Sequence, residues 1–162
     1  MPTWGVEAPP PDISSPSTRS LACAPGRLAG DDPVTCLWVI DVGTGQERLA
    51  ADPAKAGPAG GAMTDAERAI RERMRERAAG ITGFATDTAL TVAAFALAGR
   101  LYLADLTGDA TLRAIPARAP AFDPRPDPAG RRVAYVCEGA LRVTDLATGE
   151  DSEIIGPGGE PG

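Results

Sequence analysis

Short apolar runs separated by polar residues and glycines mark two segments of this chain, residues 92–115 and 133–155, and the two segments are copies of one pattern. Leu101 in the first copy matches Leu141 in the second, at a spacing of 40 residues. Short apolar runs that contain β-branched and aromatic residues are typical of buried β-strands in stacked sheets. A short turn, Ala98-Gly99, separates two such runs in the first copy. The pattern therefore predicts pairs of antiparallel strands joined by tight turns.

A third, partial copy of the pattern lies upstream, at residues 37–42. A strand–turn–strand unit that recurs every ~40 residues indicates the blade of a β-propeller, which buries its faces only against neighbouring blades. A closed propeller needs at least ~4 blades, and this chain holds two to three. The sequence therefore predicts an all-β fold, a partial β-propeller of two to three blades, whose partners include the missing blades.

One helix is predicted between the first and second copies. Residues 64–67, Thr-Asp-Ala-Glu, fit a capping box, and Gly80 fits a C-terminal stop. Ala66, Ile70 and Met74 recur at helical spacing within an otherwise charged segment. We expect an inserted amphipathic helix that packs on the sheets through this apolar stripe and exposes its charged residues to solvent.

The rest of the chain is divided by composition. No alternation is visible before residue 34, where inner strands of a first blade are expected, and five prolines between residues 116 and 130 exclude a central strand. Residues 116–130 are therefore predicted to connect two blades. The predicted units are an irregular or degraded first-blade segment (1–33), an outer hairpin and linker (34–62), a charged helix (63–80), two blades (81–120 and 121–156) and a linker tail (157–162).

Composition excludes several kinds of chemistry. The net charge of −6 argues against nucleic-acid or anionic-membrane partners. The chain has no histidine, so it cannot assemble a Ser-His-Asp or Cys-His relay or a histidine-ligated metal site. Cys23, Cys36 and Cys137 lack metal-ligand spacing and are expected as small buried residues in a reducing compartment. No signal-peptide pattern or bilayer-length apolar run is evident, so we expect a cytoplasmic location, without cofactor or metal.

Three aspartates, Asp41, Asp105 and Asp145, recur at the end of the second strand of each copy. Matched carboxylates suggest a metal or catalytic set, but each belongs to a different blade and the three are therefore expected to lie far apart. An aspartate before a turn accepts hydrogen bonds from amides two residues further on. We predict that the three carboxylates cap turns and that no catalytic, substrate-binding or metal-binding residue lies in this chain.

The most specific segment is residues 123–136, where Asp-Pro-Arg-Pro-Asp-Pro-Ala-Gly leads through two arginines into an apolar strand. This segment resembles the repeat of TolB-like propellers and of the N-terminal propeller in the prolyl oligopeptidase family. Residues 31–41, the charged helix and residues 80–87 follow in an order similar to the N-terminal region of bacterial dipeptidyl peptidase IV-like enzymes. The resemblance covers about residues 31–156.

The resemblance implies a serine peptidase in which a propeller precedes an α/β-hydrolase domain and narrows the access of peptide substrates. The hydrolase domain carries a Gly-x-Ser-x-Gly elbow, and the dipeptidyl group adds a pair of glutamates that holds the substrate amine. This chain has no such elbow and no Glu-Glu dipeptide. It is therefore predicted to be inactive alone, with the hydrolase domain as a partner. The alternative is a TolB-like propeller module that binds proteins without enzymatic activity.

Overall fold

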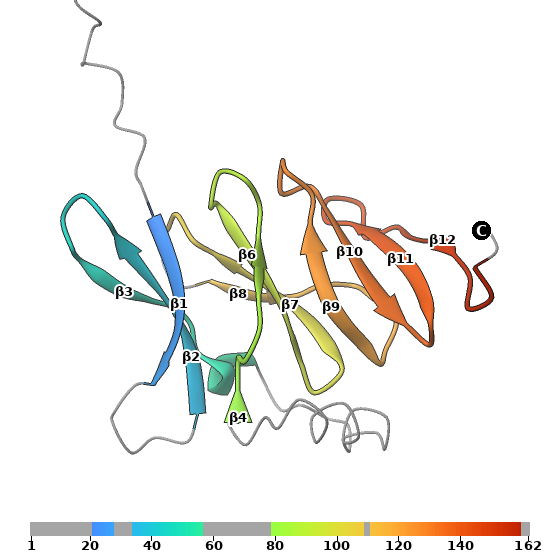
Figure 1. The fold of residues 1–162 in the computed structure, drawn as a ribbon, viewed down its shortest axis with the longest axis horizontal. Helices are drawn as coiled ribbons and strands as arrows, with labels where there is room; N and C mark the ends of the chain where they lie inside the picture. Colours follow the sequence, from blue (N-terminus) through green and yellow to red (C-terminus); the bar gives the residue numbers. More distant parts are fainter. Residues whose placement is uncertain (1–20, 28–33, 57–78, 109–110, 160–162) are drawn as a thin grey trace, which may run out of the picture.

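The structure, a computed structural model, describes residues 21–27, 34–56, 79–108 and 111–159. Three four-stranded sheets stand side by side in chain order (Figure 1). We call them blade 1, blade 2 and blade 3. Blade 1 contains β1 (Leu21–Arg27), β2 (Val34–Asp41), β3 (Glu47–Ala51) and β4 (Ala79–Gly80). Blade 2 contains β5 (Ala85–Thr86), β6 (Val92–Leu97), β7 (Arg100–Asp105) and β8 (Leu112–Ala114). Blade 3 contains β9 (Ala121–Pro126), β10 (Arg132–Cys137), β11 (Ala140–Asp145) and β12 (Asp151–Ile155).

The prediction of an all-β, partial propeller is confirmed. In blades 2 and 3 each strand pairs antiparallel with the next strand along the chain, and the sheets pack face to face in sequence order. A single turn of 3-10 helix, η1 (Pro53–Ala56), follows β3. The three sheets fan out from left to right in Figure 1, as successive blades of a propeller do.

The central hairpins of blades 2 and 3 are built alike. The turn between β6 and β7 is Ala98-Gly99, and the turn between β10 and β11 is Glu138-Gly139. All four residues have positive φ, between 49° and 80°. A two-residue loop with positive φ at both positions is a type I′ turn, whose twist matches that of the flanking strands. The tight turn predicted at Ala98-Gly99 therefore sets the register of the blade 2 hairpin, Leu97 opposite Arg100.

The core lies between the sheets rather than inside any one of them. One apolar cluster joins blades 1 and 2, where Leu37 and Val39 pack with Phe95 and Tyr102. A second cluster joins blades 2 and 3. Its buried members are Ala94, Leu101, Leu103, Ile115, Ala121, Val133, Tyr135 and Cys137. Because blade 2 contributes opposite faces to the two clusters, it is buried on both sides.

Strand β1 lies within residues 1–33, which were expected to be irregular or degraded. It pairs antiparallel with β2 over its whole length, from Leu21 opposite Asp41 to Arg27 opposite Thr35. Its sequence, Leu-Ala-Cys-Ala-Pro-Gly-Arg, contains residues that weaken an isolated strand. Pairing with the strongly β-forming β2 supplies hydrogen bonds that the local sequence does not indicate.

Most of the predicted helix at residues 63–80 falls on residues 57–78, outside the described part. Its expected end is wrong, because Ala79 and Gly80 form β4, which pairs in parallel with Val34 and Thr35. Gly80 has a φ of +105°, and a Cβ at this position would lie 2.4 Å from the Thr35 carbonyl oxygen. The glycine therefore allows the chain to pass close to β2, in addition to any role in ending a helix.

The prediction that residues 116–130 only connect blades is wrong for residues 121–126, which form β9. Prolines at positions 124 and 126 are tolerated because β9 is an edge strand, the last in the order β12-β11-β10-β9. The pairing of β9 with β10 is interrupted between Ala134 and Val136, as in a β-bulge. The prolines therefore mark the position of this strand in the sheet rather than its absence.

Candidate functional site

The three aspartates predicted to cap turns each lie directly before a turn between the last two long strands of their blade. Asp41 Oδ1 accepts hydrogen bonds from the amides of Gly43 and Thr44, both at 3.0 Å. Asp105 Oδ1 accepts from the Thr107 amide at 2.7 Å and the Gly108 amide at 3.2 Å. Each carboxylate thus satisfies backbone N–H groups that the turn leaves unpaired.

Asp145 has the same arrangement in blade 3. Its Oδ1 accepts from the Ala147 amide at 2.9 Å and the Thr148 amide at 3.1 Å. Its Oδ2 lies 3.6 Å from Nε of Arg132, the first residue of β10, which lies opposite Asp145 in the same sheet. Since the three aspartates lie in three different sheets and their carboxylates are engaged by their own turns, the structure does not bring them together.

A second matched pair of aspartates, which the sequence analysis did not single out, caps the first turn of blades 2 and 3. Asp87 accepts from the amides of Thr91 at 2.7 Å and Val92 at 3.0 Å. Asp127 accepts from the amides of Arg131 at 2.6 Å and Arg132 at 3.1 Å. Asp87 and Asp127 are 40 residues apart, so the 40-residue repeat in the sequence is the pattern by which this pair could have been found. Strand direction places the capped turns on the upper side of Figure 1 and the type I′ turns on the lower side.

Hydrogen bonds from the turn amides change the acidity of these carboxyl groups. The Thr107 amide and hydroxyl hold the pKa of Asp105 below its usual value. The Arg132 amide does the same for Asp127, and the Thr148 and Ala147 amides for Asp145. In each case the N–H donors stabilise the charged form, which outweighs the opposing effect of burial.

Acid should therefore destabilise the fold through these turns. A carboxyl group whose pKa is lower in the folded state stabilises that state fully above its unfolded pKa of 3.8, and this contribution is lost as the pH falls through the folded value. We expect the urea concentration at the midpoint of unfolding to fall between pH ~6 and pH ~3.

This fall in the urea midpoint should be smaller in the double variant Asp127→Asn/Asp145→Asn, since asparagine still accepts hydrogen bonds from the turn amides but does not titrate. Glu150→Gln, at an exposed residue, is the control and should retain the wild-type fall. An unchanged acid dependence in the double variant would contradict the assignment.

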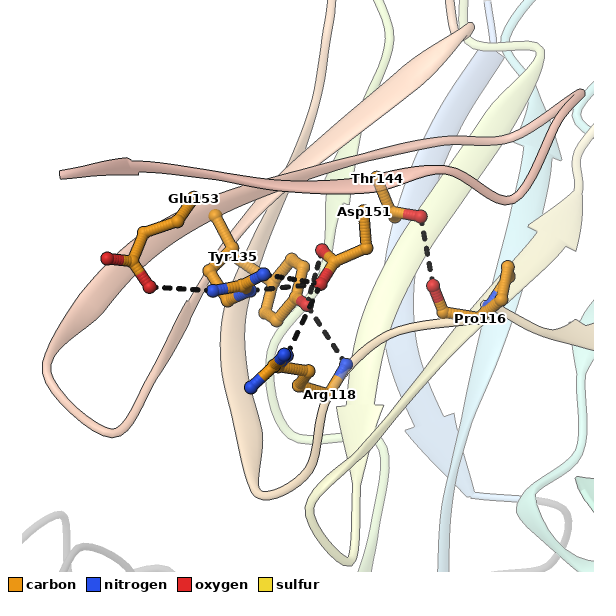
Figure 2. A network of polar contacts seen from close by, with 7 residues as sticks. Pro116, Arg118, Tyr135, Thr144, Asp151 and Glu153 are labelled. Atoms are coloured by element: carbon orange, nitrogen blue, oxygen red, sulfur yellow. Dashed lines mark hydrogen bonds and ion pairs between the residues drawn. The ribbon is translucent and has the colours of Figure 1, made fainter. Parts of the chain in front are cut away.

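A buried polar network occupies the face of blade 3 that is turned toward blade 2 (Figure 2). Arg142, 7% exposed, binds Asp151 Oδ2 through Nε at 3.0 Å and Nη2 at 2.8 Å. Its Nη1 binds Glu153 Oε2 at 2.8 Å. The Tyr135 hydroxyl donates to Asp151 Oδ1 at 2.8 Å and accepts from the Arg118 amide at 3.0 Å. The network thus ties three strands of blade 3 to the segment that enters it.

The charges in this network support one another. Asp151 raises the pKa of Arg142 through the bidentate contact, and burial raises the pKa of the Tyr135 hydroxyl. Both side chains therefore remain protonated, as the donor roles in Figure 2 require. Nearby, the Thr144 hydroxyl donates to the Pro116 carbonyl at 2.9 Å. These contacts attach the segment of residues 116–118, which connects blades 2 and 3, to blade 3.

Arginines on β3 of blade 1 and β8 of blade 2 reach across to the next blade. Arg48 on β3 donates to the carbonyl oxygens of Leu106 and, at 3.0 Å, Gly108. Arg113 on β8 donates to the carbonyl oxygen of Leu146 at 3.4 Å. Leu106 and Leu146 are matched residues, each directly after a turn-capping aspartate. The same inter-blade contact is therefore made at both junctions, and we call these two residues the junction arginines.

A surface hollow of about 270 Å³ lies beside this contact and is lined by Thr91, Leu103, Asp105 and Arg113, among others. Its two charged side chains already have partners, since Asp105 binds the amides of its own turn and Arg113 binds the Leu146 carbonyl oxygen.

Within the described ranges, histidine, cysteine and acidic side chains form no group of three that could hold a metal. In the same ranges no helix has the length and apolar character needed to cross a membrane.

Comparison with solved structures shows a similarity to a propeller protein. No protein-family model matches the chain. The crystal structure of TolB from Acinetobacter baumannii is similar over 86% of this chain, with 18% sequence identity and a TM-score of 0.30. The chain spans 39% of the length of that TolB chain. The assignment of a partial propeller therefore rests on the three sheets and their two junctions.

Proposed function

We propose that this chain is a non-catalytic propeller segment of a dipeptidyl peptidase IV-like serine peptidase, in which it supports and gates a hydrolase domain that lies outside the chain. The observation that carries the proposal is the construction of the two inter-blade junctions. Apolar clusters, the junction arginines and the Arg142 network all serve to hold sheets against one another. Together with the absence of histidine, this construction supports a scaffold rather than a reaction centre.

In this role the blades form part of a wall that restricts entry to short peptides. The reaction is acyl transfer from a peptide to a serine, followed by hydrolysis, and every reacting group comes from the hydrolase domain. Nucleic acid and membrane are not partners in this proposal. A cytoplasmic location is part of the proposal, and the buried thiol of Cys137, which forms no disulfide within the described residues, is in keeping with a reducing compartment.

Two measurements test this proposal. The purified chain should hydrolyse a chromogenic Xaa-Pro dipeptide no faster than buffer; turnover that co-purifies with the chain would overturn the assignment of catalysis elsewhere. In the coding sequence that flanks this chain, a Gly-x-Ser-x-Gly elbow with aspartate and histidine partners is expected. Further blades without such a domain would overturn the peptidase role and support the alternative, a TolB-like module for protein binding.

A further inference from the structure

One peptide bond on β9 combines a reactive sequence with an unusual backbone conformation. Asp123 precedes Pro124, and its φ is +51°, in the left-handed region that residues with a side chain rarely adopt. A residue before proline also favours extended backbone, because the proline ring crowds the residue that precedes it. The register of β9 against β10 shifts at this point, between Phe122 and Arg125. The bond between Asp123 and Pro124 therefore lies in a strained segment.

An aspartate that precedes a proline has the groups needed to cut its own chain. The side-chain carboxylate attacks the main-chain carbonyl carbon of the same residue, and the new C–O bond closes a cyclic anhydride. The C–N bond to proline breaks as the tertiary proline nitrogen takes a proton from acidified water. A water molecule then opens the anhydride and leaves aspartate as a free C-terminus. The net reaction adds one water to one peptide bond and needs no histidine relay.

The described part of the chain contains three Asp-Pro bonds, and two of them have a carboxylate that main-chain donors hold in place. Asp52 Oδ1 accepts a hydrogen bond from the Ala54 amide at 2.9 Å. Asp127 Oδ1 accepts from two amides of its own turn, at 2.6 and 3.1 Å. Of the three aspartates, Asp123 is the one with a positive φ. Attack on the adjacent carbonyl would require Asp52 or Asp127 to give up these amide contacts first.

The carboxylate of Asp123 is held less firmly. Its side chain is 59% exposed, and it forms an ion pair with Arg125, whose side chain is 66% exposed. The carboxylate oxygen Oδ1 lies 3.1 Å from Nε and 2.8 Å from Nη2 of that arginine. An exposed ion pair between side chains constrains a carboxylate less than two main-chain amides do, because water competes for both groups. The carboxylate of Asp123 is therefore free to turn toward its own carbonyl group, and water reaches it.

We propose that the bond between Asp123 and Pro124 is a self-cleavage site, which the carboxylate of Asp123 cuts in mildly acidic solution while the chain remains folded. Cleavage releases the left-handed conformation at Asp123, which favours this bond over the other two. Pro124 is buried, so the freed nitrogen stays close to the cut, but the proton that it carries prevents it from attacking the anhydride. The inference is independent of the peptidase role, because both reacting groups belong to this chain and water is the co-reactant.

The cut chain should stay assembled, because many contacts join the parts before and after the cut. Ala121 and Phe122 remain paired with β10. The Arg118 amide still donates to the Tyr135 hydroxyl. The second apolar cluster also takes its residues from both sides of the cut. The product is therefore a two-chain form of the same fold, which elutes as one species from a native column and as two fragments in denaturant.

Mass spectrometry of the full chain, incubated at the lowest pH at which circular dichroism shows that it is folded, tests this inference. We expect fragments that end at Asp123 and begin at Pro124 to form about tenfold faster than those from cuts after Asp52 and Asp127. In concentrated urea at the same pH, strain and amide contacts are lost, so the three bonds should be cut at similar rates. If the folded chain stays intact at Asp123 while the unfolded chain is cut there, the proposal is wrong.

Two variants and one inhibitor identify the reacting group. Asp123→Asn removes the nucleophilic carboxylate at an exposed position and should abolish the cut after residue 123. Asp52→Asn is the matched control, and should be cut after Asp123 as the wild type is. Circular dichroism melting establishes that both variants fold. A covalent inhibitor of serine peptidases should have no effect, which separates self-cleavage from any peptidase activity.

Several outcomes would overturn the proposal. These are similar rates at the three bonds in the folded chain, a preference for Asp123 that persists in urea, a cut that persists in Asp123→Asn, and a cut that the inhibitor blocks. Fragments that separate on a native column would contradict the two-chain product. The search for a hydrolase domain in the flanking sequence has no bearing on these results, so this proposal and the proposed function can fail separately.

Discussion

Replacing Phe95 by alanine should destabilise the chain by about 3–5 kcal/mol, as expected for a fully buried aromatic side chain. Phe95 is 0% exposed and stacks on Tyr102, with ring centroids 5.9 Å apart. It also belongs to the cluster that joins blades 1 and 2, together with Leu37 and Val39. The substitution thus removes packing at a junction, because each sheet buries its faces only against its neighbours. Urea unfolding followed by circular dichroism gives the free energy.

Phe122 on β9 is the matched control, because it is also a phenylalanine on a strand but is only half-buried. We expect Phe122→Ala to cost less than half as much as Phe95→Ala. Equal losses for the two variants would show that burial at the junction does not determine stability. A loss of less than about 1 kcal/mol for Phe95→Ala would contradict the packing of blade 1 against blade 2.

The second large effect is expected for Arg142→Ala, at about 3 kcal/mol, since removing one partner of a buried ion pair leaves an uncompensated charge. Asp151, whose side chain is 18% exposed, would lose both guanidinium contacts. Its remaining partners are the Tyr135 hydroxyl and the exposed Arg118 guanidinium, whose Nε lies 3.9 Å from Oδ2 and compensates the charge only weakly. Because Tyr135 also holds the Arg118 amide, the loss should spread to the connection between blades. Thermal and urea unfolding both measure the effect.

Two further variants separate charge from packing in this network. Arg142→Met keeps much of the side-chain volume but removes the charge, so it should remain destabilising; combining it with Asp151→Asn, which removes the stranded charge, should recover part of the loss. Arg125→Ala breaks the exposed pair with Asp123, whose side chains are 66% and 59% exposed, and should change stability by less than about 1 kcal/mol. If Arg142→Ala costs no more than Arg125→Ala, the network does not stabilise blade 3.

The strands of blade 2 and the last three strands of blade 3 were predictable because their local sequence agrees with their surroundings. Residues 92–97 and 132–137 alternate or run apolar, and the turns between strands carry glycine where a positive φ is needed. Strand β1 was not predictable from its own residues, because Ala24, Pro25 and Gly26 have low strand propensity and form a strand only by pairing with β2. Tertiary pairing, rather than local preference, decides such segments.

The polar contacts also fall into two groups, those that the local sequence indicates and those that it does not. Turn-capping by Asp145 depends on amides two and three residues away, so a local pattern is sufficient to suggest it. The junction arginines act over much longer separations, since Arg48 reaches residues almost sixty positions further on. No spacing rule along a single strand indicates such a partner. The packing order of the sheets has to be known before the contact can be inferred.

The junction arginines bind main-chain oxygens, and this has a consequence for how such a protein can grow. A carbonyl group is present whatever side chain its residue carries, so the turn that receives Arg48 or Arg113 is free to change its sequence without losing the contact. A duplicated unit would bring its own arginine and meet an acceptor already present in its neighbour. Tandem duplication would therefore lengthen the array without any matching substitution in the turn that accepts the arginine.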